Sequence, residues 1–231
     1  MSPTPPGRTH SVSFDVIGGP TITLTDFRLV VAGYTGRDER AVRQHISELA
    51  EIGVPEPDSV PTFYPLAPGL LSQSPEITVA GVNTSGEVEP VLVRHHGQLF
   101  LGVGSDHTDR DLERASVAES KAACPKPVSR QLVAVPPSVE WDAIELISTC
   151  DGRPYQQGSL ASLLPPVDVL GRYESQLGEA DDIVLFGGTV PLLDGEFIAA
   201  DEWEMTLTLP GGESVSAAYR VTLAGYQQRG A

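Results

Sequence analysis

The segment Ser85–Asp111 reads S-G-E-V-E-P-V-L-V-R-H-H-G-Q-L-F-L-G-V-G-S-D-H-T-D-R-D, and it contains the pattern that decides the fold. Two runs rich in apolar residues, Val88–Val93 and Gln98–Val103, predict two strands, and Gly97 between them predicts a hairpin turn. Acidic residues stand at the start and at the end of this hairpin. The first expectation is therefore a β core with charged groups at one edge.

Three carboxylates of this segment are candidate metal ligands. Because strand side chains alternate between faces, Glu87 and Glu89 point the same way, and Asp106 follows the second strand. Carboxylates that meet at one point repel unless a cation, a base or protonation compensates them, and this favours a hard divalent metal. Two ordinary alternatives stay open, because Pro90 fits a solvated edge strand and Asp106 fits the start of a helix.

A second candidate site lies on a helix predicted over Arg37–Ile52. His45 and Glu48 are three residues apart and are therefore neighbours on its surface. A carboxylate that holds a histidine makes the imidazole a better general base toward water. A plain surface pair is the alternative. Lys121, near the end of a helix predicted over Thr108–Ala123, is ordinarily a solvated cation.

The rest of the chain predicts mainly β structure with few helices. Gly187-Gly188-Thr189 follows an apolar run and either presents backbone N–H groups to an anion or forms a plain turn. We expect an α+β, mainly β fold with a rolled or barrel-like core. Residues 1–11 are expected to form a disordered, proline-rich lead, and residues 12–231 a single domain. Further predicted strands are Val12–Val16, Thr21–Leu24, Phe27–Ala32, Ile77–Val82, Trp141–Ile147, Asp182–Phe186, Glu202–Leu209 and Val215–Leu223.

Composition limits the kinds of partner. The chain has 231 residues and a net charge of −16, from 31 acidic and 15 basic side chains. Such an acidic surface disfavours binding to nucleic acid or to an anionic membrane. We see no signal peptide and no apolar run of the about 20 residues that a membrane helix needs. Cys124 and Cys150 are too few for a disulfide framework, and we expect reduced thiols in a cytoplasmic protein.

The order of these motifs resembles the fumarylacetoacetate hydrolase superfamily, in a divergent and poorly characterised bacterial branch. His45-x-x-Glu48 is similar to its H-x-x-E dyad, and Glu87-x-Glu89 is similar to its E-x-E metal pair. The segment Ser105–Asp111 resembles N-D-V-S-A-R-D, whose first aspartate completes the metal site. The resemblance runs in the right order over residues 32–208.

Further motifs of the same family follow along the chain. Asp151–Gln156 resembles N-G-x-x-x-Q, and Gly178–Pro191 resembles P-G-D-x-I-x-x-G-T-P. Lys121 lies where the family often has an active-site lysine, with Lys126 as the alternative. Tyr34 resembles the tyrosine of N-Y-x-x-H, although a longer gap separates it from the predicted dyad.

The resemblance implies a fold, a metal and a reaction. The fold is a mixed β-sandwich roll, and Glu87, Glu89 and Asp106 hold Mg²⁺ or Mn²⁺. The enzyme is expected to hydrolyse a C–C bond in a 2-oxo acid or 1,3-dicarbonyl, an acylpyruvate-like substrate, through a metal-stabilised enolate. His45, oriented by Glu48, is expected to activate the attacking water. A homodimer is implied as well.

The resemblance also implies roles for residues outside the metal site. Lys121 is expected to be catalytic, and the substrate-binding residues are Gln156, Thr189 and Tyr34. A residue of Arg37-Asp38-Glu39 is the alternative to the dyad. The same metal site also suits a decarboxylase, an isomerase or a dehydratase of an oxo acid. A non-catalytic binding protein on this fold is the third possibility.

Overall fold

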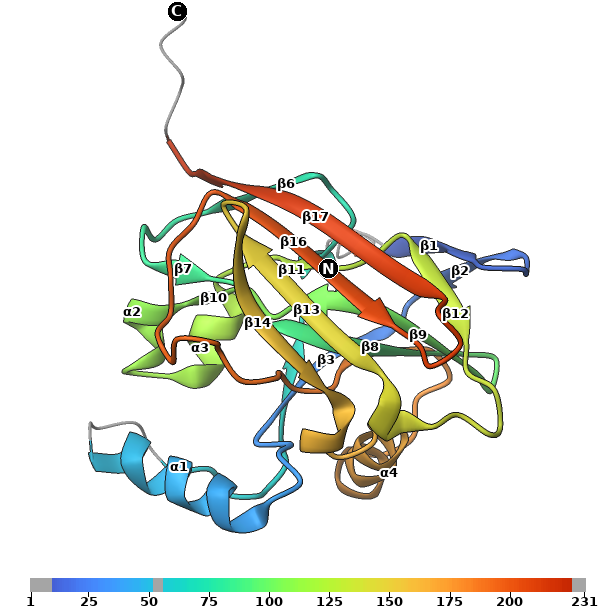
Figure 1. Cartoon of the computed structure of the whole chain (residues 1–231), viewed down its shortest axis with the longest axis horizontal. Coiled ribbons are helices and arrows are strands. Elements are labelled where there is room, and N and C mark those ends of the chain that lie inside the picture. Colours follow the sequence, from blue (N-terminus) through green and yellow to red (C-terminus); the bar gives the residue numbers. More distant parts are fainter. Residues whose placement is uncertain (1–9, 52–55, 226–231) are drawn as a thin grey trace, which may run out of the picture.

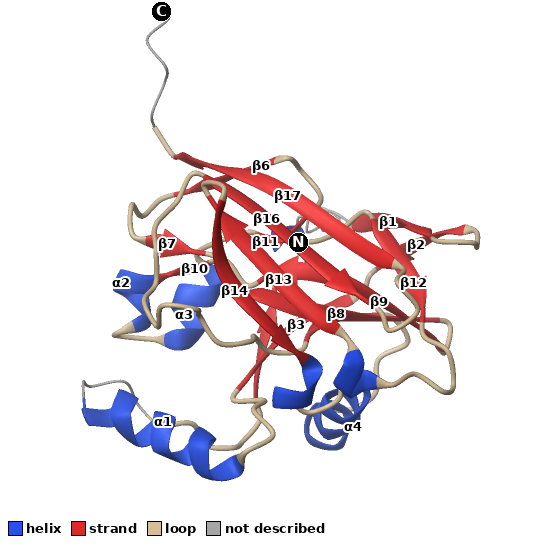
Figure 2. Cartoon of the chain, in the orientation of Figure 1, coloured by secondary structure: helices blue, strands red, loops and turns tan. Residues whose placement is uncertain are grey.

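The computed structural model describes residues 10–51 and 56–225, with the side chains of His45 and Leu49 left out, and this part of the chain is mostly β (Figures 1 and 2). Two large sheets, of eight and five strands, form most of the molecule. Two short strand pairs accompany them: β7 (Thr84–Ser85) with β10 (Thr108–Asp109), and β5 (Leu71–Ser72) with β11 (Lys126–Pro127).

The eight-stranded sheet contains the predicted hairpin at its centre. Its strands are β1 Ser11–Val16, β2 Thr21–Thr25, β3 Arg28–Gly33, β4 Thr62–Leu66, β8 Val88–His95, β9 Gln98–Ser105, β12 Gln131–Ala134 and β15 Ile183–Phe186. They lie in the order β2-β1-β12-β9-β8-β15-β3-β4. Strands β8 and β9 are antiparallel, whereas β15 is antiparallel to β8 and parallel to β3. Segments far apart in the chain therefore meet beside β8.

The five-stranded sheet covers one face of this hairpin (Figure 1). Its strands are β6 Glu76–Val79, β13 Glu145–Cys150, β14 Arg153–Ser159, β16 Glu202–Thr208 and β17 Ser214–Leu223. Their order is β14-β13-β16-β17-β6. Buried and more exposed residues alternate along β13 and β16, so each presents one face to the core. Leu146 and Trp203 pack there with Val88 and Val103 of the hairpin, which joins the two sheets.

Few helices accompany the sheets in the described part of the chain. They are α1 Glu39–Glu51, α2 Arg110–Glu113, α3 Val117–Ala122 and α4 Pro166–Leu177, with 3₁₀ turns at Pro68–Leu70, Trp141–Ala143 and Leu160–Ser162. Val169, Leu170 and Tyr173 of α4 pack on Val30 and Leu185 of the eight-stranded sheet. No helix in the described residues is long and apolar enough to cross a membrane.

The predicted fold class is confirmed, whereas several element boundaries differ. The helix predicted over Thr108–Ala123 is two helices, because the Ser116 hydroxyl accepts from the Glu119 N–H and starts α3 anew. The strand predicted from Trp141 begins only at Glu145. Of the predicted lead, residues 1–9 lie outside the described part, and β1 already begins at residue 11.

Gly104→Ala is expected to lower the free energy of unfolding by about 1–3 kcal/mol, because overpacking forces neighbouring atoms to shift. Gly104 faces Glu89 across the β8–β9 ladder. A Cβ there would lie 2.5 Å from Phe186 Cε1 and 2.9 Å from the Pro127 carbonyl oxygen. Urea unfolding followed by tryptophan fluorescence measures the loss.

Gly171→Ala in α4 is the matched control. No atom lies within 4 Å of the added Cβ, so this change is expected to be neutral or stabilising by up to about 1 kcal/mol. Equal losses in the two variants would contradict the packing argument.

Candidate functional site

Glu89 is a buried carboxylate near the start of β8, with 3% of its surface exposed. One of its oxygens accepts a 2.9 Å hydrogen bond from the backbone N–H of Gly188, in the predicted loop after β15. Glycine is required at this position, because its φ is 96° and a Cβ would lie 1.8 Å from Thr35 Oγ1. The loop after β15 therefore contacts the Glu89 carboxylate through a backbone N–H group.

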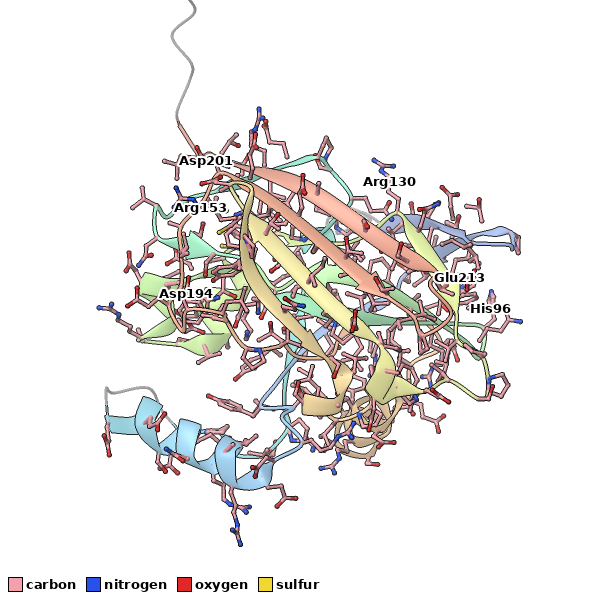
Figure 3. The ribbon with its side chains drawn as sticks, viewed as in Figure 1. His96, Arg130, Arg153, Asp194, Asp201 and Glu213 are labelled. Carbon is pink, nitrogen blue, oxygen red and sulfur yellow. The ribbon has the colours of Figure 1, made fainter. Side chains whose placement is uncertain are left out.

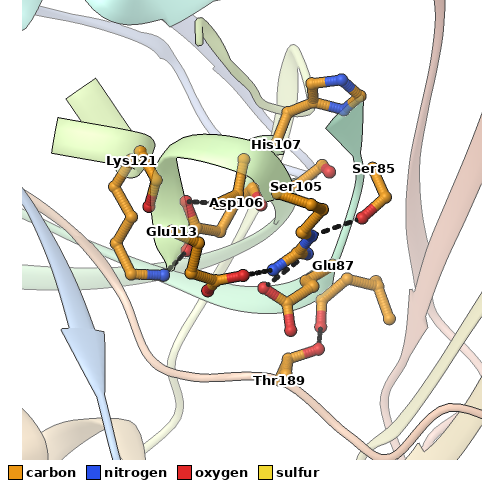
Figure 4. A network of polar contacts seen from close by, with 12 residues as sticks. Ser85, Glu87, Ser105, Asp106, His107, Glu113, Lys121 and Thr189 are labelled. Carbon is orange, nitrogen blue, oxygen red and sulfur yellow. Dashed lines mark hydrogen bonds and ion pairs between the residues drawn. The ribbon is translucent and has the colours of Figure 1, made fainter. Parts of the chain in front are cut away.

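Asp106 lies immediately after β9 and has no exposed surface. Lys121 Nζ, from α3, donates to its Oδ2, and Lys126 Nζ, from β11, lies 3.1 Å from its Oδ1. Figure 4 shows Lys121 reaching Asp106. The sequence left open which lysine belongs to the site. Both hold Asp106, and Lys121 also lines the cavity described below.

These charges shift one another's pKa values. Burial alone raises the pKa of Asp106, but the two ammonium groups outweigh it and hold that pKa well below its usual range. Burial, followed by the Asp106 charge, raises the pKa of Glu89 well above its usual range. Burial lowers the pKa of Lys121, but its acidic neighbours raise it further, so Lys121 keeps its proton. Lys121 also acts on Glu89, but its charge does not outweigh the burial of that carboxylate.

Arg110 holds the other glutamate of the pair. Its Nη2 lies 3.1 Å from Glu87 Oε2, and its Nη1 donates to Glu113 at 2.8 Å. Its Nε donates to the Ser85 hydroxyl at 2.7 Å, and its guanidinium stacks 3.5 Å over the ring of Phe197. Sequence reasoning missed these partners, because Ser85, Glu87 and Phe197 are distant from Arg110 along the chain and Glu113 is one of several acids close to it.

Gln156 and Thr189 form a brace around Val88, the residue between the two glutamates. The Gln156 side-chain oxygen accepts from the Val88 N–H at 2.8 Å. The Thr189 hydroxyl donates to the Val88 carbonyl at 2.9 Å and accepts from the Gln156 amide at 2.7 Å. Gln156 is buried and is bonded within the protein, whereas Thr189 also lines the cavity.

A cavity of about 820 Å³ opens beside this cluster. Polar groups reach it from both glutamates, Lys121, Thr189 and Tyr34, and burial raises the pKa of the Tyr34 phenol. The structure thus brings together most of the residues that the sequence singled out. Apolar lining residues include Ala32, Val42, Val117, Leu163, Pro191 and Phe197.

The predicted dyad on α1 is not part of this cluster in the described residues. The side chain of His45 lies outside the described part of the structure. Glu48 is exposed, accepts a 2.8 Å hydrogen bond from Gln44 on the same helix, and does not line the cavity. The first turns of α1 line it instead, through Ala41 and Val42.

Arg37 and Asp38, alternatives to the dyad, do lie at the cavity. Asp38 Oδ1 accepts from the backbone N–H of Arg40 at 2.9 Å and so caps the start of α1. The Arg37 guanidinium makes two hydrogen bonds, of 2.8 and 2.7 Å, with Asp142. Both side chains are therefore hydrogen-bonded within the protein: Asp38 to the backbone of α1 and Arg37 to Asp142.

The three carboxylates fit a hard divalent cation in their chemistry, because oxygen donors suit such ions. Buried Glu89, with its raised pKa, is the donor that gains most from a positive charge. Asp106 is shared with two lysines, however. In the described part of the chain, no set of one oxygen each from Glu87, Glu89 and Asp106 lies mutually within 4.8 Å.

Three solved structures share this fold. A protein from Oleispira antarctica, provisionally named a fumarylacetoacetate isomerase/hydrolase, has 18% identity and a TM-score of 0.63, over 90% of this chain and 99% of its own. A provisionally named fumarylpyruvate hydrolase from Burkholderia cenocepacia has 18% identity and a TM-score of 0.61, over 96% of each chain. The 5-carboxymethyl-2-hydroxymuconate delta-isomerase from Mycobacterium smegmatis has 15% identity and a TM-score of 0.57, over 86% of this chain and 79% of its own.

Sequence comparison points to one family. No curated protein matches the sequence. A family model described as "Protein of unknown function (DUF2848)" matches residues 32–219. The chain therefore belongs to that family, and its fold is the one of the fumarylacetoacetate hydrolase superfamily, as its motifs predicted.

Proposed function

We propose that the chain is an enzyme that hydrolyses a C–C bond in a 2-oxo acid or a 1,3-dicarbonyl. One observation supports this most: Glu87, Glu89 and Lys121 line one otherwise largely apolar cavity. Acidic groups and an ammonium inside apolar walls suit a small substrate with a carboxylate and carbonyl oxygens. The structures that share the fold are named as hydrolases and as an isomerase, which supports enzymatic activity.

Glu87, Glu89 and Asp106 are the residues that would hold Mg²⁺ or Mn²⁺. When bound, such an ion polarises carbonyl oxygens as a Lewis acid. Lys121 keeps its proton, so its ammonium can donate to a substrate carboxylate or to a developing oxyanion. The Thr189 hydroxyl donates to the Val88 carbonyl and accepts from Gln156, so it would have to release that carbonyl to donate to a substrate oxygen.

Hydrolysis also needs a base for the attacking water, and we assign this role to His45 on α1. Ala41 and Val42 of α1 line the cavity, and position 45 follows about one turn later on the same helix. The exposed position of Glu48 favours a second candidate. Decarboxylation, isomerisation or dehydration of an oxo acid uses the same carboxylates and ammonium without an attacking water.

The oligomeric state, the cellular compartment and the partners of the protein are inferred from its resemblance and its composition. We infer a homodimer from the resemblance to the superfamily. We infer a cytoplasmic protein, because Cys124 and Cys150 are free thiols. The excess of acidic side chains argues against nucleic acid as a partner.

Glu87→Gln should lower Mg²⁺-dependent cleavage of acetylpyruvate by at least about 100-fold, because it removes an anionic ligand. The reaction adds water and gives acetate and pyruvate, which nuclear magnetic resonance identifies. Glu204→Gln, on the exposed face of β16, is the matched control and should retain activity. Circular dichroism checks that both variants fold.

Other outcomes of this experiment separate the candidates. Full activity in EDTA, or wild-type kinetics in Glu87→Gln, would contradict the proposed metal-dependent hydrolysis. Release of CO₂ from oxaloacetate without cleavage of acetylpyruvate would favour the second candidate. Absence of both reactions, with no Mg²⁺ binding in calorimetry, would favour a non-catalytic binding protein.

Glu89→Gln should raise the melting temperature at about pH 8 while weakening Mg²⁺ binding. Burial raises the pKa of Glu89, so its ionised form opposes folding, and glutamine keeps an acceptor for the Gly188 N–H. The protonated carboxyl favours folding below its ordinary pKa of 4.5, and this stability is lost as the pH rises through the raised pKa.

The melting temperature of Glu89→Gln should therefore exceed that of the wild type by less and less as the pH falls from the raised pKa of Glu89 to its ordinary pKa. Thermal melts in EDTA over a series of buffers measure the difference. A variant that melts below the wild type at about pH 8 would show that Lys121 already compensates Glu89.

A further inference from the structure

The turn end of the β8–β9 hairpin carries a second cluster of ligating side chains. His95 ends β8, His96 opens the two-residue turn, and Asp182 precedes β15. One ligand atom from each lies within 4.8 Å of the other two. His95 lies six residue steps along β8 from Glu89, or roughly 20 Å at about 3.3 Å per step. The cluster is therefore distinct from the carboxylate site, and Figure 3 places His96 at the periphery of the molecule.

The geometry of these side chains is already fixed. His95 Nδ1 lies 2.9 and 3.0 Å from the two carboxylate oxygens of Asp182, and both residues are largely buried. The rings of His95 and His96 are 4.0 Å apart between their centroids. Only the more exposed His96 needs to adjust to complete a set of three ligands.

The backbone of His96 determines where its side chain lies. Its φ is 48° and that of Gly97 is 76°, as in a type I′ turn, where Asn or Gly is the usual first residue. Histidine is, with Asn and Asp, one of the non-glycine residues that adopt this left-handed conformation most often. The conformation turns the His96 ring toward His95.

The surrounding charges favour a cation. Asp181, next to Asp182, is a second, exposed acid. The nearest cationic side chain along β8, Arg94, is paired with Glu174 and donates to the Ala180 carbonyl. The negative net charge of the whole chain acts in the same direction.

We propose that His95, His96 and Asp182 form a second metal site, which takes a divalent transition metal of the Zn²⁺ type. Two imidazoles and one carboxylate suit Zn²⁺, Cu²⁺ or Ni²⁺ far better than Mg²⁺, which prefers oxygen ligands throughout. With three protein ligands, the ion retains positions for water. The metal replaces the proton that His95 and Asp182 share.

Such an ion would fasten the hairpin to the start of β15. Strands β8 and β15 carry Glu89 and the Gly188 loop at their other ends. A ligand that binds only the folded chain stabilises it, so Zn²⁺ should raise the melting temperature.

The test is calorimetric titration of the full chain with Zn²⁺, after EDTA treatment and in millimolar Mg²⁺, which occupies sites with oxygen ligands. We expect one Zn²⁺ per chain. His96→Gln and Asp182→Asn should each weaken binding by at least about 10-fold and remove the rise in melting temperature. Asp182→Asn retains a hydrogen-bond partner for His95 and so guards against unfolding.

Two control variants make the result specific. His10→Gln removes an exposed histidine elsewhere, and Glu87→Gln alters the carboxylate site, so both should bind Zn²⁺ like the wild type. No binding by the wild type would overturn the proposal. Unchanged binding in His96→Gln and Asp182→Asn, or a loss only in Glu87→Gln, would overturn it as well.

Discussion

A negative charge enclosed in the protein interior constrains the rest of the site. Asp106 has no exposed surface, and an isolated carboxylate there would cost several kcal/mol. Lys121 and Lys126 offset that cost from two different elements, α3 and β11. The segment after β9 must therefore fold back so that both ammonium groups reach one aspartate. Such a buried pair adds little net stability, and its effect is to fix where α3 lies relative to β8 and β9.

The same constraint bears on the proposed metal. A divalent ion bound to Asp106 would compete with the two lysines for its oxygens. Lys121 lines the cavity, whereas Lys126 is completely buried and also donates to the His107 carbonyl at 2.6 Å. Lys121 is therefore the group that has room to move toward a substrate, while Lys126 retains Asp106. This division of roles follows from burial alone and does not depend on which reaction the enzyme performs.

Strand alternation let the sequence predict the pairing of Glu87 with Glu89 and the hairpin that carries them, because that pattern is local. The split of the predicted helix at Ser116 was also readable, since Ser116-x-x-Glu119 is a capping box, but the prediction took Thr108 as its only start. The partners of Arg110 were not readable. Phe197 reaches it by tertiary packing, and Glu113, although it lies only three residues further along α2, is one acid among many in an acidic chain. The dyad on α1 rested on the resemblance and not on a contact, so the structure leaves it a proposal.

Gln156 shows how a residue named for substrate binding can matter through the backbone. Its amide is bonded to Thr189, Val190 and Val88, so it has little capacity left for a ligand. Val88 is held at its N–H by Gln156 and at its carbonyl by Thr189. Because Val88 separates the two glutamates, this brace sets the direction of both carboxylates from the five-stranded sheet and from the glycine loop at once. A family motif can therefore be retained because it orients the acids, even where its side chain does not touch the substrate.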